Sequence, residues 1–434
     1  MAEISLVGHW AGLTALAVFL LAYALVIAEE ATQLRKSTPV MAAAGVIWAL
    51  IGVAFVQTGQ AELVHDRAME VIADYGELLL FLLVAITYVN TLEERRAFDA
   101  LRARLVARGF SYRRLFWMTG VLAFFLSSVL DNLTTTLVIG AVIMTLGRDN
   151  ARFVTLGAIS TVVAANAGGA FSPFGDITTL MVWQQGKLDF FAFFALFLPS
   201  VVNWLVPAAI LAAALPPGAP SPSSEMVRMK PGALGVAVLF AATIATAVLF
   251  RNLLDLPPAL GMMLGLGALQ LWAHALSRLG GRRRDAEMVL DSFHQMSRVE
   301  WDTLLFFFGI IFAVGGLGVF GYLALASEGL YLGLGPTSAN TLIGMLSAVV
   351  DNIPLMFAVL KMNPAMSEGQ WLLITLTCGV GGSLLSIGSA AGVALMGQAR
   401  GVYTFASHLK WSWAIALGYA AAIGLHLWLN AALF

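Results

Sequence analysis

The sequence has little charge and almost no cysteine. Only 11% of its 434 residues are Asp, Glu, Lys or Arg, whereas roughly a quarter are charged in soluble proteins. The lone cysteine, Cys378, excludes a disulfide framework and a cysteine-based metal site. Apolar residues make up 59% of the chain, and the mean hydropathy is +0.85. These features exclude a soluble enzyme, a nucleic-acid-binding protein and a secreted disulfide-rich domain, and they indicate a membrane protein.

Long apolar runs account for this composition, and several approach the ~20 residues that cross the hydrocarbon core of a bilayer. Uninterrupted runs occupy residues 9–28, 40–57, 76–92, 190–215, 232–250, 256–274, 299–325 and 410–433. Interrupted runs occupy residues 114–148 (broken at Asp131-Asn132), 152–184 (broken around Asn166 to Asp176), 335–361 (broken at Asp351-Asn352) and 370–399 (broken around Gly379 to Ser389). The sequence therefore predicts an all-α polytopic membrane protein with discontinuous transmembrane helices.

Positive charge is distributed unevenly between the loops. We expect residues 114–148 and 335–361 to be re-entrant hairpins and the other two broken segments to cross the bilayer. With the N-terminus outside, only Arg67, Lys187, Arg251 and Lys361 of the 24 basic residues then lie outside. Because cytoplasmic loops are enriched in Lys and Arg, this distribution predicts that both termini are periplasmic. The first run has no basic region before it, so we expect a span and not a signal peptide.

The interrupted segments occur twice in the same order. Residues 127–134 align with residues 347–354, and residues 168–175 align with residues 381–388. Each half then holds three spans, a hairpin, a broken span and a last span, so the second copy is inverted relative to the first. We expect one repeat over residues 1–215 and the other over 232–434, with 216–231 as a linker. Inverted repeats with broken helices are typical of secondary transporters.

The interruptions are the candidate binding site. A helix broken inside a bilayer leaves backbone groups unpaired, and each one costs several kcal/mol unless protein, water or an ion satisfies it. A carboxylate at such a place is a functional candidate, although Asp is also a good helix N-cap, and both roles can hold together. The predicted cation- and proton-binding residues are Asp131, Asn132, Thr134, Asn166, Ser172, Asp176, Thr178, Asp351, Asn352, Ser383, Ser386 and Ser389.

The chemistry of these side chains favours a small cation. Hard oxygen ligands suit Na⁺ or Li⁺, for which Asp131, Asp176 and Asp351 are the candidate carboxylate ligands. The broken segments carry no Lys or Arg at their centres, so an anionic substrate would find no cationic partner there. Removal from water raises the pKa of a carboxyl group, which lets a proton compete with the cation. The sequence predicts exchange of cytoplasmic Na⁺ or Li⁺ for external H⁺, without a cofactor or a catalytic residue.

The same motifs resemble a known family. Residues 127–136, 166–183, 351–356 and 379–397 are similar to the NhaD-type sodium/proton antiporters of the ion transporter superfamily, over about residues 77–405. The resemblance implies a homodimer in the bacterial inner membrane, with a transport domain that moves against a static scaffold, an elevator mechanism. The dicarboxylate branch of the superfamily has Ser-Asn-Thr at the hairpin tips. Asp131-Asn132-Leu133 and Asp351-Asn352-Ile353 depart from that pattern, which disfavours an organic anion.

Other functions remain open at the level of sequence. An efflux permease for a neutral oxyacid such as arsenite would use the same scaffold. An intramembrane aspartyl protease also needs two membrane aspartates, but its Gly-x-Gly-Asp motif is replaced here by Pro173-Phe174-Gly175-Asp176. A passive channel would be distinguished by the absence of uphill transport. The expected partners are the lipid bilayer, Na⁺ or Li⁺, H⁺ and a second copy of the chain, with no nucleic acid.

Overall fold

The computed structural model describes residues 6–57, 61–106, 109–220, 227–279 and 290–434. Over these residues the chain is helical throughout, and no β-strand occurs among them. Eight of the described helical segments are long and apolar enough to cross a membrane. The predicted class, an all-α polytopic membrane protein, is confirmed.

The helices follow the predicted order. The first half contains α1 (Trp10–Ile27), α2 (Glu29–Thr32), α3 (Ser37–Gln57), α4 (Ala61–Glu94), α5 (Ala97–Val106), α6 (Tyr112–Ser127), α7 (Asn132–Leu146), α8 (Ala151–Ala170), α9 (Ile177–Gln184), the 3-10 segment η1 (Phe190–Leu196) and α10 (Phe197–Ala213). The second half contains α11 (Ala233–Leu254), α12 (Pro258–Leu279), α13 (Ser292–Ser297), α14 (Trp301–Phe320), α15 (Tyr322–Ser327), the π-helical segment η2 (Glu328–Leu332), α16 (Pro336–Leu346), α17 (Asn352–Met362), α18 (Glu368–Gly381), α19 (Ala390–Gln398), α20 (Phe405–Leu409), α21 (Ser412–Leu429) and the 3-10 segment η3 (Ala431–Leu433).

Each predicted interruption separates two helices. Residues 128–131 separate α6 from α7, and residues 347–351 separate α16 from α17. The other two breaks start later than expected, because Asn166 lies inside α8 and Gly379 lies inside α18. These two breaks occupy residues 171–176 and 382–389. The sequence therefore locates every break, although it places the start of two of them too early.

Two uninterrupted spans differ from the prediction. The span expected at 76–92 belongs to α4, which is 34 residues long. Charged residues upstream of position 76 lower the hydropathy, but they do not interrupt a helix. The span expected at 299–325 divides at Gly321, whose φ of 98° ends α14 and starts α15. Glycine adopts this left-handed conformation without a steric penalty, which makes it a common helix terminator.

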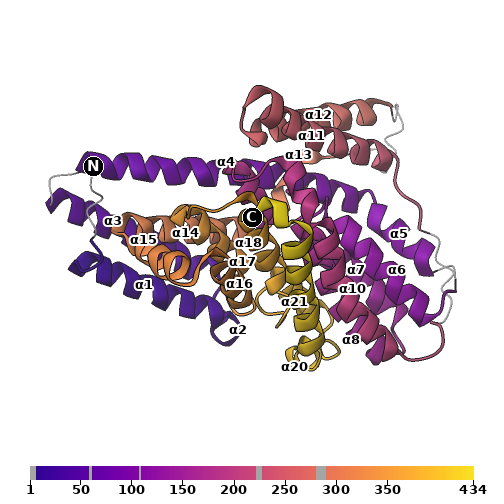
Figure 1. Cartoon of the computed structure of the whole chain (residues 1–434). Helices are drawn as coiled ribbons and strands as arrows, with labels where there is room; N and C mark the ends of the chain where they lie inside the picture. The colour runs from indigo at the N-terminus through magenta and orange to yellow at the C-terminus, as the bar shows by residue number, and fades with distance from the viewer. Residues whose placement is uncertain (1–5, 58–60, 107–108, 221–226, 280–289) are drawn as a thin grey trace.

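The helices pack in two groups (Figure 1). The first helix group contains α1, α3, α4, α11, α12 and α14, with α3 packed against both α1 and α14 and with α12 packed against α4 and α11. The second helix group contains α6–α10, α16–α19 and α21. Within it, α7 packs on α19, α17 packs on α9, α8 packs on α18 and α10 packs on α21. The main packing between the groups is that of α14 against α17, and α15, which packs on α14, also contacts α17.

Two close helix crossings occur at aligned positions of the two halves. A Cβ atom added at Gly168 of α8 would overlap the carbonyl oxygen of Phe124 in α6. A Cβ atom added at Gly381 of α18 would likewise overlap the carbonyl oxygen of Gly344 in α16. Only glycine permits backbones to approach this closely, as at many helix contacts in membranes. The two crossings explain why a glycine-rich motif occurs at the aligned positions of both halves.

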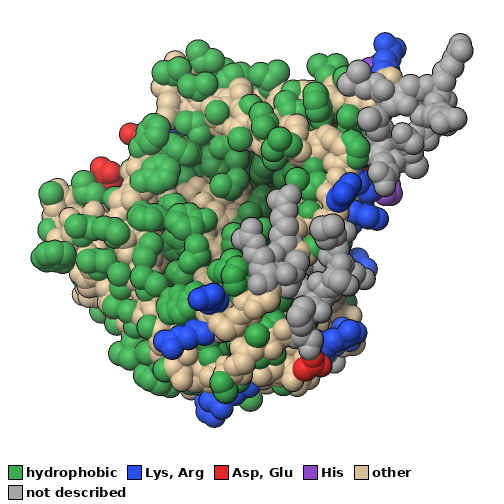
Figure 2. Space-filling view, turned by 90° about the vertical axis from the view of Figure 1, so that its right-hand side faces the viewer, with side chains coloured by type: hydrophobic (Ala, Val, Ile, Leu, Met, Phe, Trp, Pro, Cys, Tyr) green, Lys and Arg blue, Asp and Glu red, His purple; other side chains and the backbone are tan. Residues whose placement is uncertain are grey.

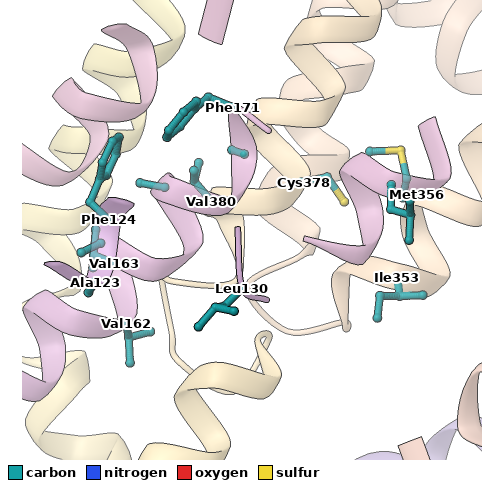
Figure 3. Close-up of a cluster of buried hydrophobic side chains, with 14 of the residues drawn as sticks. Ala123, Phe124, Leu130, Val162, Val163, Phe171, Ile353, Met356, Cys378 and Val380 are labelled. Atoms are coloured by element: carbon teal, nitrogen blue, oxygen red, sulfur yellow. The ribbon is translucent and has the colours of Figure 1, made fainter. Parts of the chain in front are cut away.

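An apolar core surrounds the broken helices (Figure 3). Phe124 of α6 stacks on Phe171, the first residue of the α8–α9 break, with ring centroids 5.3 Å apart. Figure 3 also shows Cys378 and Val380 of α18 near this core, with Met356 of α17 beside Cys378. All five side chains are buried. Close packing on this scale holds the irregular backbone of the breaks in one arrangement.

The molecular surface agrees with a membrane setting. Large apolar side chains are exposed on several long helices, including Leu234 and Leu253 of α11 and Leu271 of α12. On the face in Figure 2, Lys and Arg side chains lie mainly along the lower and right-hand margins of a large apolar area, whereas few Asp or Glu side chains are visible. An apolar area bordered by charged side chains agrees with a surface that faces lipid between two polar margins.

Candidate cation-binding site

Two helix pairs, α6–α7 and α16–α17, meet at one carboxylate. We call the turn of each pair, with the first residue of its second helix, the tip. Asn132 begins α7 and Asn352 begins α17, and both amides reach Asp176 in the α8–α9 break. The Nδ2 atom of Asn132 donates to Asp176 Oδ2 over 2.8 Å. The Nδ2 atom of Asn352 donates to the same oxygen over 3.2 Å. Residues that lie 44 and 176 positions from Asp176 in sequence thus converge on one side chain.

Asp176 is buried and firmly oriented. Its side chain is 3% exposed, and among the described residues it is the one acidic side chain classed as buried. It caps the N-terminus of α9, where Oδ1 accepts hydrogen bonds from the backbone N–H and the hydroxyl of Thr178, both at 2.9 Å. One carboxylate oxygen therefore holds the helix, while the other faces the two tips. Asp176 thus combines a helix cap with hydrogen bonds from the amides of Asn132 and Asn352.

Asn166 joins this carboxylate to the second break. Its Oδ1 atom accepts a hydrogen bond from Asn132 Nδ2 over 3.0 Å. Its Nδ2 atom donates to the hydroxyl oxygens of Ser383 and Ser389 over 2.8 and 3.1 Å. Asn166, Ser383 and Ser389 are all buried. The structure thus brings both tips and both breaks into one hydrogen-bonded cluster.

Asp131 and Asp351 occupy a different position from Asp176. Asp131 caps α7, and its two oxygens accept hydrogen bonds from the backbone N–H (2.9 Å) and hydroxyl (2.7 Å) of Thr134. Asp351 caps α17 and accepts from the backbone N–H of Ile353 over 3.0 Å. No group of three acidic, histidine or cysteine side chains that could hold a metal ion occurs in the described part of the chain. The three aspartates predicted as metal ligands therefore do not form one carboxylate cluster.

The remaining predicted residues line the breaks without touching Asp176. The Ser172 hydroxyl accepts from the backbone N–H of Phe174 over 3.3 Å, and its carbonyl accepts from the Thr179 hydroxyl over 2.9 Å. The Ser386 hydroxyl lies 2.6 Å from the Tyr403 hydroxyl. Thr179 was expected from sequence as one of the hydroxyl ligands at the first break. Tyr403 was not predicted, since nothing in its spacing sets it apart from other polar residues near helix ends.

Comparison of the whole chain with known proteins identifies its family. Residues 9–379 match a family model described as citrate transporter. The chain is 53% identical over 452 residues to the Na⁺/H⁺ antiporter NhaD of Alkalimonas amylolytica, covering 100% of this chain and 94% of the relative. The chain belongs to the NhaD-type antiporter family.

Other relatives agree. The Na⁺/H⁺ antiporter NhaD of Vibrio cholerae is 53% identical over 438 residues, covering 96% of this chain and 92% of the relative. Sodium/proton antiporter 1 of Arabidopsis thaliana is 34% identical over 424 residues, covering 94% of this chain and 71% of the relative. The predicted family resemblance is confirmed over nearly the whole chain. In this NhaD-type chain the cluster offers one buried carboxylate, amide and hydroxyl oxygens, and unwound backbone, all hard ligands suited to an alkali cation.

Proposed function

We propose that this chain is a secondary active antiporter that exchanges cytoplasmic Na⁺, or Li⁺, for external H⁺. The observation that carries the proposal is Asp176, a buried carboxylate at a helix break to which the amides of both tips donate. The identity to Na⁺/H⁺ antiporters over the full chain supports the same reaction. The proposal needs no cofactor, because the transported ions are themselves the ligands.

The tip asparagines suit a site that alternates between two ligands. An amide group carries N–H donors on one side and an oxygen acceptor on the other. With the N–H groups turned toward Asp176, Asn132 and Asn352 stabilise the negative charge. After rotation about the last side-chain bond, the same amides would present oxygen atoms to a cation held by Asp176. Protonation of Asp176 removes the charge that attracts the cation, so mutual exclusion is sufficient to couple the two fluxes.

Asp131 and Asp351 would act from beside Asp176. Each caps a helix whose next residue, Asn132 or Asn352, contacts Asp176. A carboxylate at each tip adds negative potential that favours a cation, while the cap fixes the direction in which the asparagine points. Thr134, Thr178, Ser172, Ser383, Ser386 and Ser389 complete the proposed shell with hydroxyl or backbone oxygens.

The proposed architecture is that of two inverted repeats, residues 1–215 and 232–434, whose linker 216–231 extends partly outside the described residues. The aligned crossings at Gly168 and Gly381 support it. We assign the first helix group to a scaffold and the second helix group to a moving transport domain, since few helices pack between the two groups. A homodimer in the bacterial inner membrane, held through the scaffold, completes this elevator proposal.

Ion pairs support the grouping of residues by side of the membrane, on which the proposed orientation is based. Lys361 near the end of α17 contacts Glu70 (3.0 Å) and Asp74 (2.6 Å) in the N-terminal half of α4, all on the side assigned to the periplasm. Lys230 contacts Glu94 (2.7 Å) on the side assigned to the cytoplasm. Residues assigned to the same side of the membrane are thus neighbours in space.

Cysteine labelling tests this orientation. In a Cys378→Ser background, Ala219→Cys should react with an impermeant maleimide only from the cytoplasm, because this exposed residue lies in the linker assigned inside. Ala365→Cys, at the exposed turn between α17 and α18, should react in intact cells. Labelling of Ala219→Cys in intact cells would contradict the two-hairpin topology.

The reaction itself is tested in everted membrane vesicles. An imposed proton gradient is followed with a pH-sensitive dye, and Na⁺, Li⁺ or K⁺ is then added. Antiport predicts recovery of fluorescence with Na⁺ or Li⁺, because the cation drives protons out of the vesicle. A gradient that persists after every cation, in vesicles that contain the protein, would reject the proposal and favour the oxyacid permease.

A further inference from the structure

A buried series of hydrogen-bonded side chains contacts the second helix break, residues 382–389. The Ser386 hydroxyl lies 2.6 Å from the Tyr403 hydroxyl, which lies 2.8 Å from His408 Nδ1. His408 Nε2 lies 2.7 Å from the carbonyl oxygen of Ser383, so the series of hydrogen bonds begins and ends at the second break. All four residues are buried. Tyr403 and His408 lie after α19, outside the cluster around Asp176.

The hydrogen positions in this series follow from chemistry. A carbonyl oxygen only accepts, so His408 Nε2 carries a proton and donates to Ser383. In a neutral imidazole the other nitrogen is then an acceptor, so the Tyr403 hydroxyl donates to Nδ1. The single Tyr403 proton is thereby used, and the Ser386 hydroxyl must donate to Tyr403. The proton of Ser386 points toward Tyr403, which leaves the lone pairs of its oxygen free for another partner.

Ser386 needs such support because of its backbone. Its φ of 67° lies in the left-handed region, which serine rarely adopts and which costs on the order of 1–3 kcal/mol. The first break is braced internally, by the Thr179 hydroxyl donating to the carbonyls of Ser172 (2.9 Å) and Asp176 (2.6 Å). The residue aligned with Thr179 is Gly392, where a Cβ atom would overlap the Ser386 carbonyl. The second break cannot use the same brace, and Tyr403 and His408 take its place.

We infer that Tyr403 and His408 are positioning residues that hold the second break in its ligand-binding shape and aim the Ser386 oxygen at the transported cation. The inference rests on the proposed antiport function. The geometry supports it because Ser383 contacts both sides. Its carbonyl oxygen accepts a hydrogen bond from His408, and its hydroxyl accepts one from Asn166. Loss of the brace would leave Ser386 free to turn, and the cation would lose an ordered ligand.

Tyr403→Phe tests the inference, because it keeps the buried ring and removes only the hydroxyl. We expect its apparent KM for Na⁺ to rise about tenfold, which corresponds to about 1.4 kcal/mol, with the maximal rate retained. Tyr419→Phe is the matched control: Tyr419 is also buried, and its hydroxyl donates to the Thr341 carbonyl at 3.0 Å. The control should leave the KM unchanged. Equal KM values for wild type and Tyr403→Phe, or an equal rise in both variants, would overturn the inference.

A second pair of variants distinguishes the positioning role from a role in folding alone. His408→Gln keeps an N–H donor that can reach Ser383 and should give a KM between those of wild type and His408→Ala. Stabilisation of the purified protein against heat by Na⁺ gives a readout that does not depend on flux. If wild type shows neither Na⁺-driven flux nor Na⁺ stabilisation, the proposed function fails. If wild type shows both and His408→Ala responds to Na⁺ as wild type does, only the positioning role fails.

Discussion

Replacement of Asp176 by asparagine is the sharpest test of the site. Asn caps helices about as well as Asp, so the start of α9 and its bond from the Thr178 backbone should persist. What disappears is the negative charge. For unit charges about 4 Å apart at an effective dielectric constant of about 20, the interaction is about 4 kcal/mol. Since about 1.4 kcal/mol corresponds to a tenfold change in affinity, Asp176→Asn should weaken Na⁺ binding about a thousandfold.

The assay is dye dequenching in everted vesicles over a wide range of Na⁺ concentrations, with protein amount measured in the same membranes. Asp291→Asn is the matched control, because Asp291 caps α13 through the backbone N–H of His294 (3.0 Å) and makes no hydrogen bond to the site. We expect Asp176→Asn to give no Na⁺-driven proton flux and Asp291→Asn to match wild type. Flux near the wild-type level in Asp176→Asn would refute the assignment of this carboxylate as the ion ligand and reduce it to a helix cap.

Further predictions concern the tips and the helix crossings. Asp131→Asn and Asp351→Asn should each lower exchange about tenfold or more, because they remove negative potential beside Asp176 while keeping the caps; unchanged flux in either variant would limit that residue to capping. Gly168→Ala should lower the melting temperature of the purified protein by several degrees, since overpacking costs about 1–3 kcal/mol and the obstacle is a backbone carbonyl. Gly45→Ala, which has open space around its Cβ position, should melt at or slightly above the wild-type temperature.

Much of the fold could be read from the sequence because its signals are local. Apolar runs mark spans, and Asp-Asn pairs within apolar surroundings mark the ends of α6 and α16 and the starts of α7 and α17. The length of α4 was missed because hydropathy measures membrane preference and not helix continuity. The late starts of two breaks were missed because Gly168 and Gly381 stay helical where another backbone crosses them.

The site was predicted less completely, because its geometry is not local. In the sequence Asp131, Asp176 and Asp351 are equivalent candidates. The fold distinguishes them, since the amides of both tips donate to Asp176. In the sequence Tyr403 does not stand out, and His408 is one of six histidines near span ends for which ordinary interfacial packing is expected. Their contact with the second break depends on the return of the chain after α19.

Competition between Na⁺ and H⁺ at Asp176 is the central claim, and the pH dependence of the apparent KM for Na⁺ tests it most directly. Protonation at low pH removes the charge that binds the cation. The KM should therefore rise about tenfold for each pH unit below the pKa of the site and become constant above it, with the maximal rate much less affected. The measurement is a series of Na⁺ titrations of wild-type vesicles across the neutral and alkaline range. A KM that does not change with pH, while the maximal rate does, would contradict direct competition at Asp176 and indicate a separate pH-sensing group.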